Sequence, residues 1–289
     1  MLTPEQLEAR RIGGSDIGII LGLNPWRMPI DLYREKIGEA EPFQGNEHTQ
    51  AGEVMEGAIA DLYELRTGRP VRRSNLTHTH REHDFLTAHV DRVTVGEKRI
   101  VEIKNIGRNG AKAWGQPGTD QVPAYYLAQV HHYMLVLDYP HADVVAYFGG
   151  GDLGIYPVDR SAEWDALIIE KARAFWQCVQ TRTPPEFDPQ HPAALDTIKR
   201  LHPGTDGSTV AGDTMLGYWA QVEQDAAKTA ARYETIAEGA RAHILAAMGD
   251  AAVLTLPDGG QYTRKLVKRG AYQVESTEYM QLRYKKGKE

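Results

Sequence analysis

The sequence has little cysteine, no long apolar run and no excess of positive charge. Its single cysteine, Cys178, excludes a disulfide framework, a cysteine-based zinc site and an iron–sulfur cluster within one chain. No apolar run approaches the roughly 18 residues that span a bilayer, and the N-terminal MLTPEQLEARR lacks the apolar core of a signal peptide. We therefore expect a cytoplasmic protein that does not cross a membrane.

The charge balance limits how the chain can meet nucleic acid. Its 289 residues carry a net charge of −6, so DNA binding must depend on local positive patches and metal ions. A hydrophobic share of 42% and a charged share of 25% are ordinary for a globular protein. The length suits one large domain with an appendage, or two domains.

The stretch 85–105, FLTAHVDRVTVGEKRIVEIKN, predicts a β-hairpin. β-Branched residues dominate both arms, Leu86–Val95 and Arg99–Lys104, and the single glycine falls in the turn between them. Alternation along a strand puts Glu102 and Lys104 on one face, where Asp91 can join them if the arms pair.

Such a cluster has a chemical purpose. Two neighbouring carboxylates repel each other unless a cation neutralises them, and hard oxygen ligands suit Mg²⁺ or Mn²⁺. A neighbouring lysine adds positive charge where a scissile phosphate or an attacking water would sit. The alternative for Asp91, Glu102 and Lys104 is a solvated strand face with an ion pair.

Near the N-terminus, RIGGSDIGIILGLNPW predicts a short apolar helix, Asp16–Leu21, with Ser15 as its N-cap. A glycine-flanked helix start presents free backbone N–H groups, and Arg11 lies just before it, a combination that can hold a phosphate. The alternative is a capped helix with a surface arginine. A second helix is predicted over Pro29–Lys36, ended by Gly38.

A mobile loop over Gly45–Gln50 and a helix over Glu53–Arg66 are predicted next. The apolar stripe of this helix consists of Met55, Ile59 and Leu62. Glu56 lies beside the stripe, where its carboxylate could face a cleft or simply be solvated. The stretch Val71–Thr79 predicts another strand.

After the hairpin, Ile106–Gln121 predicts a loop that leaves Lys112 and Trp114 exposed enough to meet a ligand. Pro123 then opens the strong helix AYYLAQVHHYMLVLD. Gln129 and Tyr133 are neighbours one turn apart on it. A glutamine among apolar residues needs a partner if buried, which leaves a structural hydrogen bond and a substrate contact as alternatives.

The remaining sequence predicts a hairpin, helices and a linker. The elements are strands Asp143–Phe148 and Gly154–Val158, helix Ala162–Thr181, a linker over 186–212, a long helix Asp213–Met248 and a hairpin Ala252–Leu266. The resulting domains are 1–185, then the linker, then a helix-and-hairpin appendage over 213–289. Its basic tail, 264–288, could contact DNA or be a solvated terminus.

Taken together and in order, several motifs resemble the YqaJ-like viral recombinase family, which includes phage lambda exonuclease, within the PD-(D/E)xK nuclease superfamily. They are Arg11 with GGSDIGIILGLNPW, then GEVMEGAIADLYELRTG, AHVDR with VEIKN, and Trp114 with VPAYYLAQVHHYM. The resemblance covers about Arg11–Pro185. It implies an α/β (α+β) fold with a restriction-endonuclease-like core, a central mixed sheet flanked by helices.

The resemblance also implies roles for individual residues. Asp91, Glu102, Lys104, Glu56 and Gln129 correspond to catalytic positions. One or two Mg²⁺ or Mn²⁺ ions would be held by Asp91, Glu102, the carbonyl of Ile103, and Glu56. DNA or its 5′-phosphate would meet Arg11, Ser15, Lys112, Trp114 and Tyr133. The Gly-Gly before Ser15 is the form found in prophage members of the family.

The implied activity is Mg²⁺-dependent 5′–3′ digestion of linear double-stranded DNA, leaving 3′ single-stranded overhangs for recombination. Implied partners are DNA ends, a single-strand annealing protein and further copies of the chain in a ring-shaped homo-oligomer, in a bacterial host of a phage or prophage. Alternatives are an endonuclease and a non-catalytic DNA-binding or assembly module on the same fold.

Overall fold

A computed structural model describes residues 10–41, 45, 47–107, 110–149 and 151–268. The chain divides into two compact units, Met1–Leu201 and His202–Glu289. None of the helices in the described part combines the length and the apolar character needed to cross a lipid bilayer.

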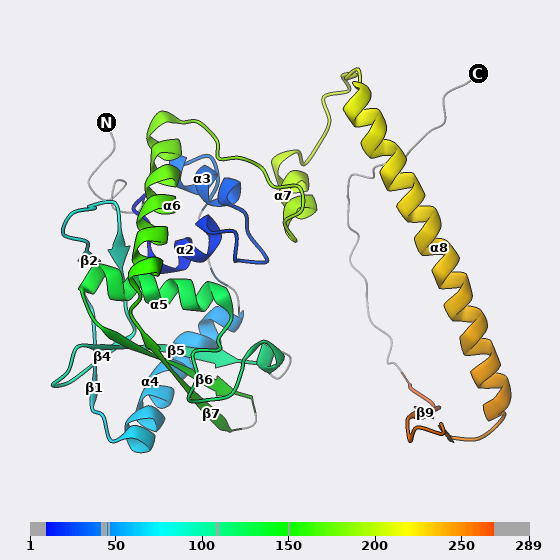
Figure 1. Ribbon diagram of the computed structural model, residues 1–289, viewed down its shortest axis with the longest axis horizontal. Coiled ribbons are helices and arrows are strands. Elements are labelled where there is room, and N and C mark those ends of the chain that lie inside the picture. The colour runs from blue at the N-terminus through cyan, green and yellow to red at the C-terminus, as the bar shows by residue number, and fades with distance from the viewer. Residues whose placement is uncertain (1–9, 42–44, 46, 108–109, 150, 269–289) are drawn as a thin grey trace. The chain divides into compact units, whose positions relative to one another are not determined.

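A mixed β-sheet forms the centre of the first unit (Figure 1). Its strands, in spatial order, are β1 (Val71–Arg73), β4 (Arg92–Thr94), β5 (Arg99–Ile106), β6 (His141–Phe148) and β7 (Asp152–Asp159). β5 and β6 are parallel, whereas the other neighbours are antiparallel. Helix α5 (Ala124–Leu137) makes the crossover that a parallel pair requires. The predicted α/β class with a central mixed sheet is confirmed.

Helices cover both faces of this sheet. On one face, α2 (Gly14–Ile20), α3 (Pro29–Ile37), α5 and α6 (Ala162–Thr181) share one apolar cluster with the strands. On the other, α4 (Glu47–Thr67) contributes Ile59 and Tyr63, which pack with Val101 and Ile103 of β5. The alternation of side chains along β5 therefore gives each face its own core.

The boundaries of several predicted helices are confirmed, but α4 differs. It begins at Glu47, so the part of the predicted loop from Glu47 to Gln50 is helical. Leu62, placed in the apolar stripe, is 40% exposed, whereas Tyr63 is fully buried. The buried line is Ile59, Ala60 and Tyr63, a spacing of one, three and four residues that fits a helix face.

The first arm of the predicted hairpin is interrupted. Its start forms β3 (Thr87–Ala88), which pairs with β2 (His78–Thr79) in a separate small sheet, and its end forms β4. Asp91 lies between the two, and its side-chain Oδ2 accepts the backbone N–H of Ile103 at 2.8 Å. A carboxylate thus takes the place of a backbone acceptor beside β5. The predicted strand Val71–Thr79 is likewise divided, into β1 and β2.

Helix α7 (Ala194–Leu201) lies within the stretch predicted to be a linker. Thr197 donates a hydrogen bond to Asp31 of α3 at 2.8 Å, and Arg200 lies 3.0 Å from the same carboxylate. These contacts attach α7 to the first unit, so the linker predicted from the proline, glycine and aspartate content was wrong for this segment.

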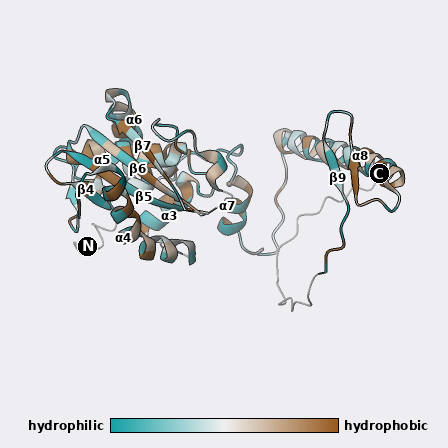
Figure 2. Cartoon of the chain, turned by 90° about the horizontal axis from the view of Figure 1, so that it is seen from below, coloured by the Kyte–Doolittle hydropathy of each residue, from teal (hydrophilic) through white to brown (hydrophobic). Residues whose placement is uncertain are grey.

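The second unit contains the elements expected of the C-terminal stretch. Helix α8 (Thr214–Met248) starts after Asp213, whose carboxylate accepts the N–H of Leu216 at 2.8 Å, and strands β8 (Val253–Thr255) and β9 (Gln261–Thr263) follow. Hydrophobic residues are spread along α8, and Trp219 is 54% exposed (Figure 2). Most of the basic tail, from 269 on, lies outside the described residues.

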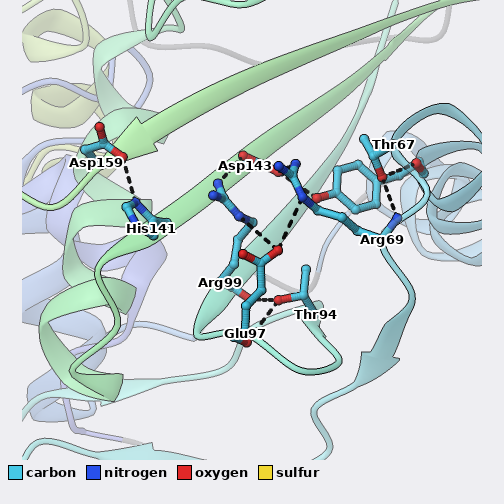
Figure 3. Close-up of polar contacts among 9 residues, drawn as sticks. Thr67, Arg69, Thr94, Glu97, Arg99, His141, Asp143 and Asp159 are labelled. Carbon is cyan, nitrogen blue, oxygen red and sulfur yellow. Dashed lines mark hydrogen bonds and ion pairs between the residues drawn. The ribbon is translucent and has the colours of Figure 1, made fainter.

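A buried carboxylate joins α4, β5 and β6. Asp143 is only 1% exposed and accepts hydrogen bonds from Tyr63 at 2.6 Å, Arg99 at 2.8 Å and Arg69 at 3.4 Å (Figure 3). By contrast, the pair between His141 and Asp159, 2.7 Å apart, lies at the surface. Burial without these partners would be strongly unfavourable for Asp143.

We expect Asp143→Ala to lower the free energy of unfolding by about 3–5 kcal/mol, because the largely buried Arg99 would lose its 2.8 Å partner and keep only the longer contact with Glu97. Asp159→Ala, which removes an exposed partner, should cost less than about 1 kcal/mol. Urea unfolding of both variants measures the difference. Equal losses would contradict a structural role for the buried carboxylate.

Candidate active site

The first part of the site is a buried glutamate on β5. Glu102 is 2% exposed, and its Oε1 accepts hydrogen bonds from Lys104 Nζ at 2.6 Å and Gln129 Nε2 at 2.9 Å. Lys104 Nζ also donates to Gln129 Oε1 at 3.2 Å. The second oxygen of Glu102, Oε2, is buried, and no N–H or O–H donor in the described part of the chain reaches it, whereas the carboxyl of Asp91 lies beside Glu102.

Asp91 completes this acidic centre. Its carboxylate is held by the N–H of Ile103 at 2.8 Å, and its charge acts on both Glu102 and Lys104. The N–H and C=O of one strand residue point toward the same edge, so the carbonyl of Ile103 lies on the edge that faces Asp91. The structure therefore brings together the three side chains predicted to share one face.

Burial dominates the electrostatics of the acidic centre. Burial, with the charge of Asp91 added, raises the pKa of Glu102 to about 8, against the opposing effect of Lys104. Burial also raises the pKa of Asp91 above its ordinary value. For Lys104, burial lowers the pKa, but the charges of Glu102 and Asp91 outweigh it and leave the pKa raised. Lys104 is therefore an ammonium group at neutral pH.

Gln129 links the acidic centre to helix α2. It is 9% exposed, and its Nε2 contacts Tyr133 Oη at 2.8 Å in addition to Glu102. The ring of Tyr133 lies directly against Gly14, where an added Cβ would come within 2.2 Å of a ring carbon. Gln129 thus makes a structural hydrogen bond to Glu102, and only glycine fits at position 14 without displacing Tyr133.

The cap of α2 differs from the prediction. The N-cap is Gly13, and its N–H donates to Asp16 Oδ2 at 2.9 Å, whereas Ser15 lies inside the first turn with an exposed side chain. The carboxylate three residues beyond the cap thus accepts the N–H of the cap residue itself, which is one half of a capping box. Arg11, half-buried, lies within 3.4 Å of Thr79 Oγ1.

The expected DNA contacts in the 106–121 loop divide into two cases. Lys112 is exposed, within a short 3₁₀ turn, η1 (Gly110–Ala113). Trp114 is not exposed as expected but half-buried, with its ring packed against Tyr126, Phe148 and Tyr156. Its large apolar surface is more stable inside this aromatic group than in solvent.

Glu56 lies near the acidic centre but is turned toward arginines. It accepts a hydrogen bond from Arg92 and lies 3.7 Å from Arg73, and its charge raises the pKa of Asp91. The sequence analysis missed Arg92, which is 6% exposed and also donates to the carbonyl of Asp91 at 2.8 Å. The available signal was a charged residue on the apolar face of a predicted strand.

The donor atoms of the acidic centre fit a hard divalent cation. Asp91 and Glu102 supply carboxylate oxygens, Ile103 a carbonyl, and Glu102 Oε2 is without a partner among the described residues. Mg²⁺ is commonly held by one or two carboxylates, with waters and substrate phosphates completing its shell. In the described part of the chain, no three Asp, Glu, His or Cys side chains are placed to hold a metal together.

Comparison with known proteins gives a consistent picture. The family model of the YqaJ-like viral recombinase domain matches residues 5–140, which include Glu56, Asp91, Glu102, Lys104 and Gln129. The uncharacterized protein YqaJ of Bacillus subtilis (strain 168) is 31% identical over 236 residues, or 80% of this chain and 68% of that protein.

Two solved structures share the fold. The alkaline exonuclease LHK-Exo from Laribacter hongkongensis has a TM-score of 0.52 at 16% identity, and covers 69% of this chain and 97% of its own. LHK-Exo in complex with dAMP has a TM-score of 0.53 at 16% identity, with coverage of 68% and 95%. At this identity the likeness shows the fold alone.

The raised pKa of Glu102 predicts a pH-dependent stability in EDTA. A carboxyl whose pKa rises from 4.5 to about 8 on folding binds more protons in the folded state between these values. Its favourable contribution is therefore complete at low pH and is lost as the pH rises through that window. Urea unfolding at about pH 5 and about pH 8 should show the wild type losing stability relative to Glu102→Gln. A constant difference would contradict the raised pKa.

Proposed function

The chain belongs to the YqaJ-like viral recombinase family, and on this basis we propose that it is a DNA exonuclease that requires a divalent cation. It would digest the 5′ strand of linear duplex DNA and leave a 3′ overhang for a single-strand annealing protein. The observation that carries the proposal is the buried centre of Asp91, Glu102 and Lys104, with a carboxylate oxygen free to bind a cation. The fold shared with an alkaline exonuclease supports it.

The cation site would consist of Asp91, Glu102 and the carbonyl of Ile103, with Glu56 nearby for a second ion. Bound Mg²⁺ or Mn²⁺ would supply a water of lowered pKa and neutralise charge on the phosphate. Because the pKa of Glu102 is raised to about 8, its carboxyl must lose a proton before it can bind a cation. Cation binding at this site should therefore be favoured at alkaline pH.

Lys104 acts as a cation in this proposal. Its acidic neighbours raise its pKa, so it would not remove a proton. Two of its three N–H groups are bound by Glu102 and Gln129, and the third would donate to the attacking water or to a phosphate oxygen. Gln129 holds both Glu102 Oε1 and Lys104 Nζ, and so fixes the distance between the acid and the ammonium group. The side chains of the centre are thereby oriented before substrate binds.

The segment at the start of α2 would select the 5′ end of the strand that is digested. Tyr133 lies between Gln129 and Gly14, so the start of α2 is connected to the acidic centre through the Tyr133 and Gln129 side chains. Arg11 and Ser15 belong to this segment, and we assign them to the terminal 5′-phosphate, with Lys112 as a further backbone contact. We also propose a ring-shaped homo-oligomer, for which gel filtration showing only monomer would be contrary evidence.

We expect Asp91→Ala and Lys104→Ala each to reduce nuclease activity by about 10²-fold to 10³-fold or more, because each removes charge at the reacting phosphate. Asp61→Ala and Lys171→Ala, at exposed positions, serve as matched controls and should keep activity near wild type. The measurement is release of nucleotides from linear duplex DNA with Mg²⁺. Full activity of either site variant would refute the assignment.

Digestion of different DNA ends tests the mode of action. Linear duplex with 5′-phosphate ends should lose its 5′ strand with Mg²⁺ and not with EDTA, whereas a covalently closed circle should survive. Arg11→Gln should remove the preference for a 5′-phosphate over a 5′-hydroxyl. Cleavage of the circle would identify an endonuclease, and absence of digestion under every condition would leave a binding or assembly role.

A further inference from the structure

A second charged feature lies on the opposite face of the sheet from the acidic centre. Asp143 of β6 is paired in register with Val101, whose side chain points toward α4, whereas the neighbouring Glu102 points toward α5. Beside Asp143 is a cavity of about 470 Å³ whose polar lining also includes Arg66, Arg69 and Arg99. The cavity is therefore separate from the proposed catalytic centre.

Positive charge exceeds negative charge at this cavity. Arg69 and Arg99 both approach Asp143 and Glu97, as Figure 3 shows, while Arg66 makes no hydrogen bond or ion pair with any described residue. Three guanidinium groups thus face two carboxylates. The group therefore carries a net charge of +1, so the cavity should attract an anion.

The arginines also keep unused donors. Arg99 Nε is buried without a hydrogen-bond partner among the described residues, and its ion-pair contact with Glu97 Oε1 is long, at 3.5 Å. Arg69 reaches its two carboxylates only at 3.4 Å and 3.3 Å, contacts weak enough to exchange for a better acceptor.

The shape of the cavity indicates more than an isolated ion. Leu153, Ile155 and Pro157 line it on the β7 side, and Gly118 is held to that strand by its N–H bond to the Ile155 carbonyl at 2.9 Å. The volume falls within the range of small-molecule sites, roughly 300–1,000 Å³. Guanidinium forks match phosphate oxygens, and an apolar wall suits a sugar and a base.

We propose that this cavity binds a phosphate-bearing ligand of nucleotide size, through Arg66, Arg69 and Arg99. The ligand is either a free deoxynucleoside monophosphate or the terminal nucleotide of a DNA strand, which share the same chemistry. The phosphate is inferred from the arginines, whereas the choice of a nucleotide rests on the proposed function. Such a site on an exonuclease would hold a released product or guide the end of a strand away from the acidic centre.

Calorimetric titration of the full chain with dTMP in EDTA tests the proposal, because without divalent cations the acidic centre offers little attraction for phosphate. With Arg11→Gln present in every sample, to remove the proposed 5′-phosphate contact, we expect one nucleotide per chain. The dissociation constant should be at least about tenfold higher when the double variant Arg66→Gln/Arg69→Gln is added. Arg66→Gln alone, which removes a side chain without partners among the described residues, should weaken binding without altering the fold. Arg72→Gln, an exposed arginine outside the cavity lining, is the matched control.

Several results would overturn the proposal: no binding by the Arg11→Gln protein, equal affinity with and without the double variant, or equal weakening by Lys104→Ala, which would place the nucleotide at the acidic centre. Binding of inorganic phosphate as tight as that of dTMP would contradict the role of the apolar wall. A 5′-phosphorylated hexathymidylate distinguishes the sources, since binding dependent on Arg66 and Arg69 indicates a strand terminus and dTMP binding alone a free nucleotide. Nuclease assays are independent, because the double variant should still digest linear duplex.

Discussion

The burial of carboxylates beside β5 is the constraint on which the rest of the first unit depends. A buried charge is tolerated only with partners, and Glu102 has two, Lys104 and Gln129, both on one of its oxygens. The hydrogen bond from Gln129 fixes the position of α5 relative to β5. Tyr133 of α5 then lies so close to the start of α2 that only glycine fits at position 14. The other oxygen of Glu102 is left without a partner in the described structure, as a cation site would require.

The same strand serves two charged regions because its side chains alternate. Glu102 and Lys104 point toward α5, whereas Val101 and its register partner Asp143 point toward α4. The sheet therefore separates an acidic centre from an arginine-rich cavity by the thickness of one strand layer. In a chain of net charge −6, this separation provides local positive charge for a polyanion without neutralising the carboxylates that hold a cation.

Interruption of the sheet is part of how the acidic centre is made. Had the first arm continued as a regular strand, the N–H of Ile103 would have met a backbone carbonyl. Instead, Asp91 supplies the acceptor, and Arg92 anchors the same point by binding Glu56 and the Asp91 carbonyl. Irregular backbone of this kind is common where a protein must aim a side chain. Local sequence patterns favour an unbroken strand, which is why this feature was not predicted.

The sequence by itself determined most helix boundaries and the grouping of Asp91, Glu102 and Lys104, because hydrophobic periodicity and strand alternation are local properties. The central mixed sheet was expected only because the motifs resemble those of a known family. Only the tertiary structure decided that Gly13 rather than Ser15 is the N-cap of α2, that Trp114 packs among aromatic rings, and that Arg92 binds Glu56. It also attached α7 to Asp31 within an expected linker. Most of these contacts join residues far apart in the chain. Which side chains come within bonding distance depends on how the segments pack, and no local sequence pattern specifies that packing.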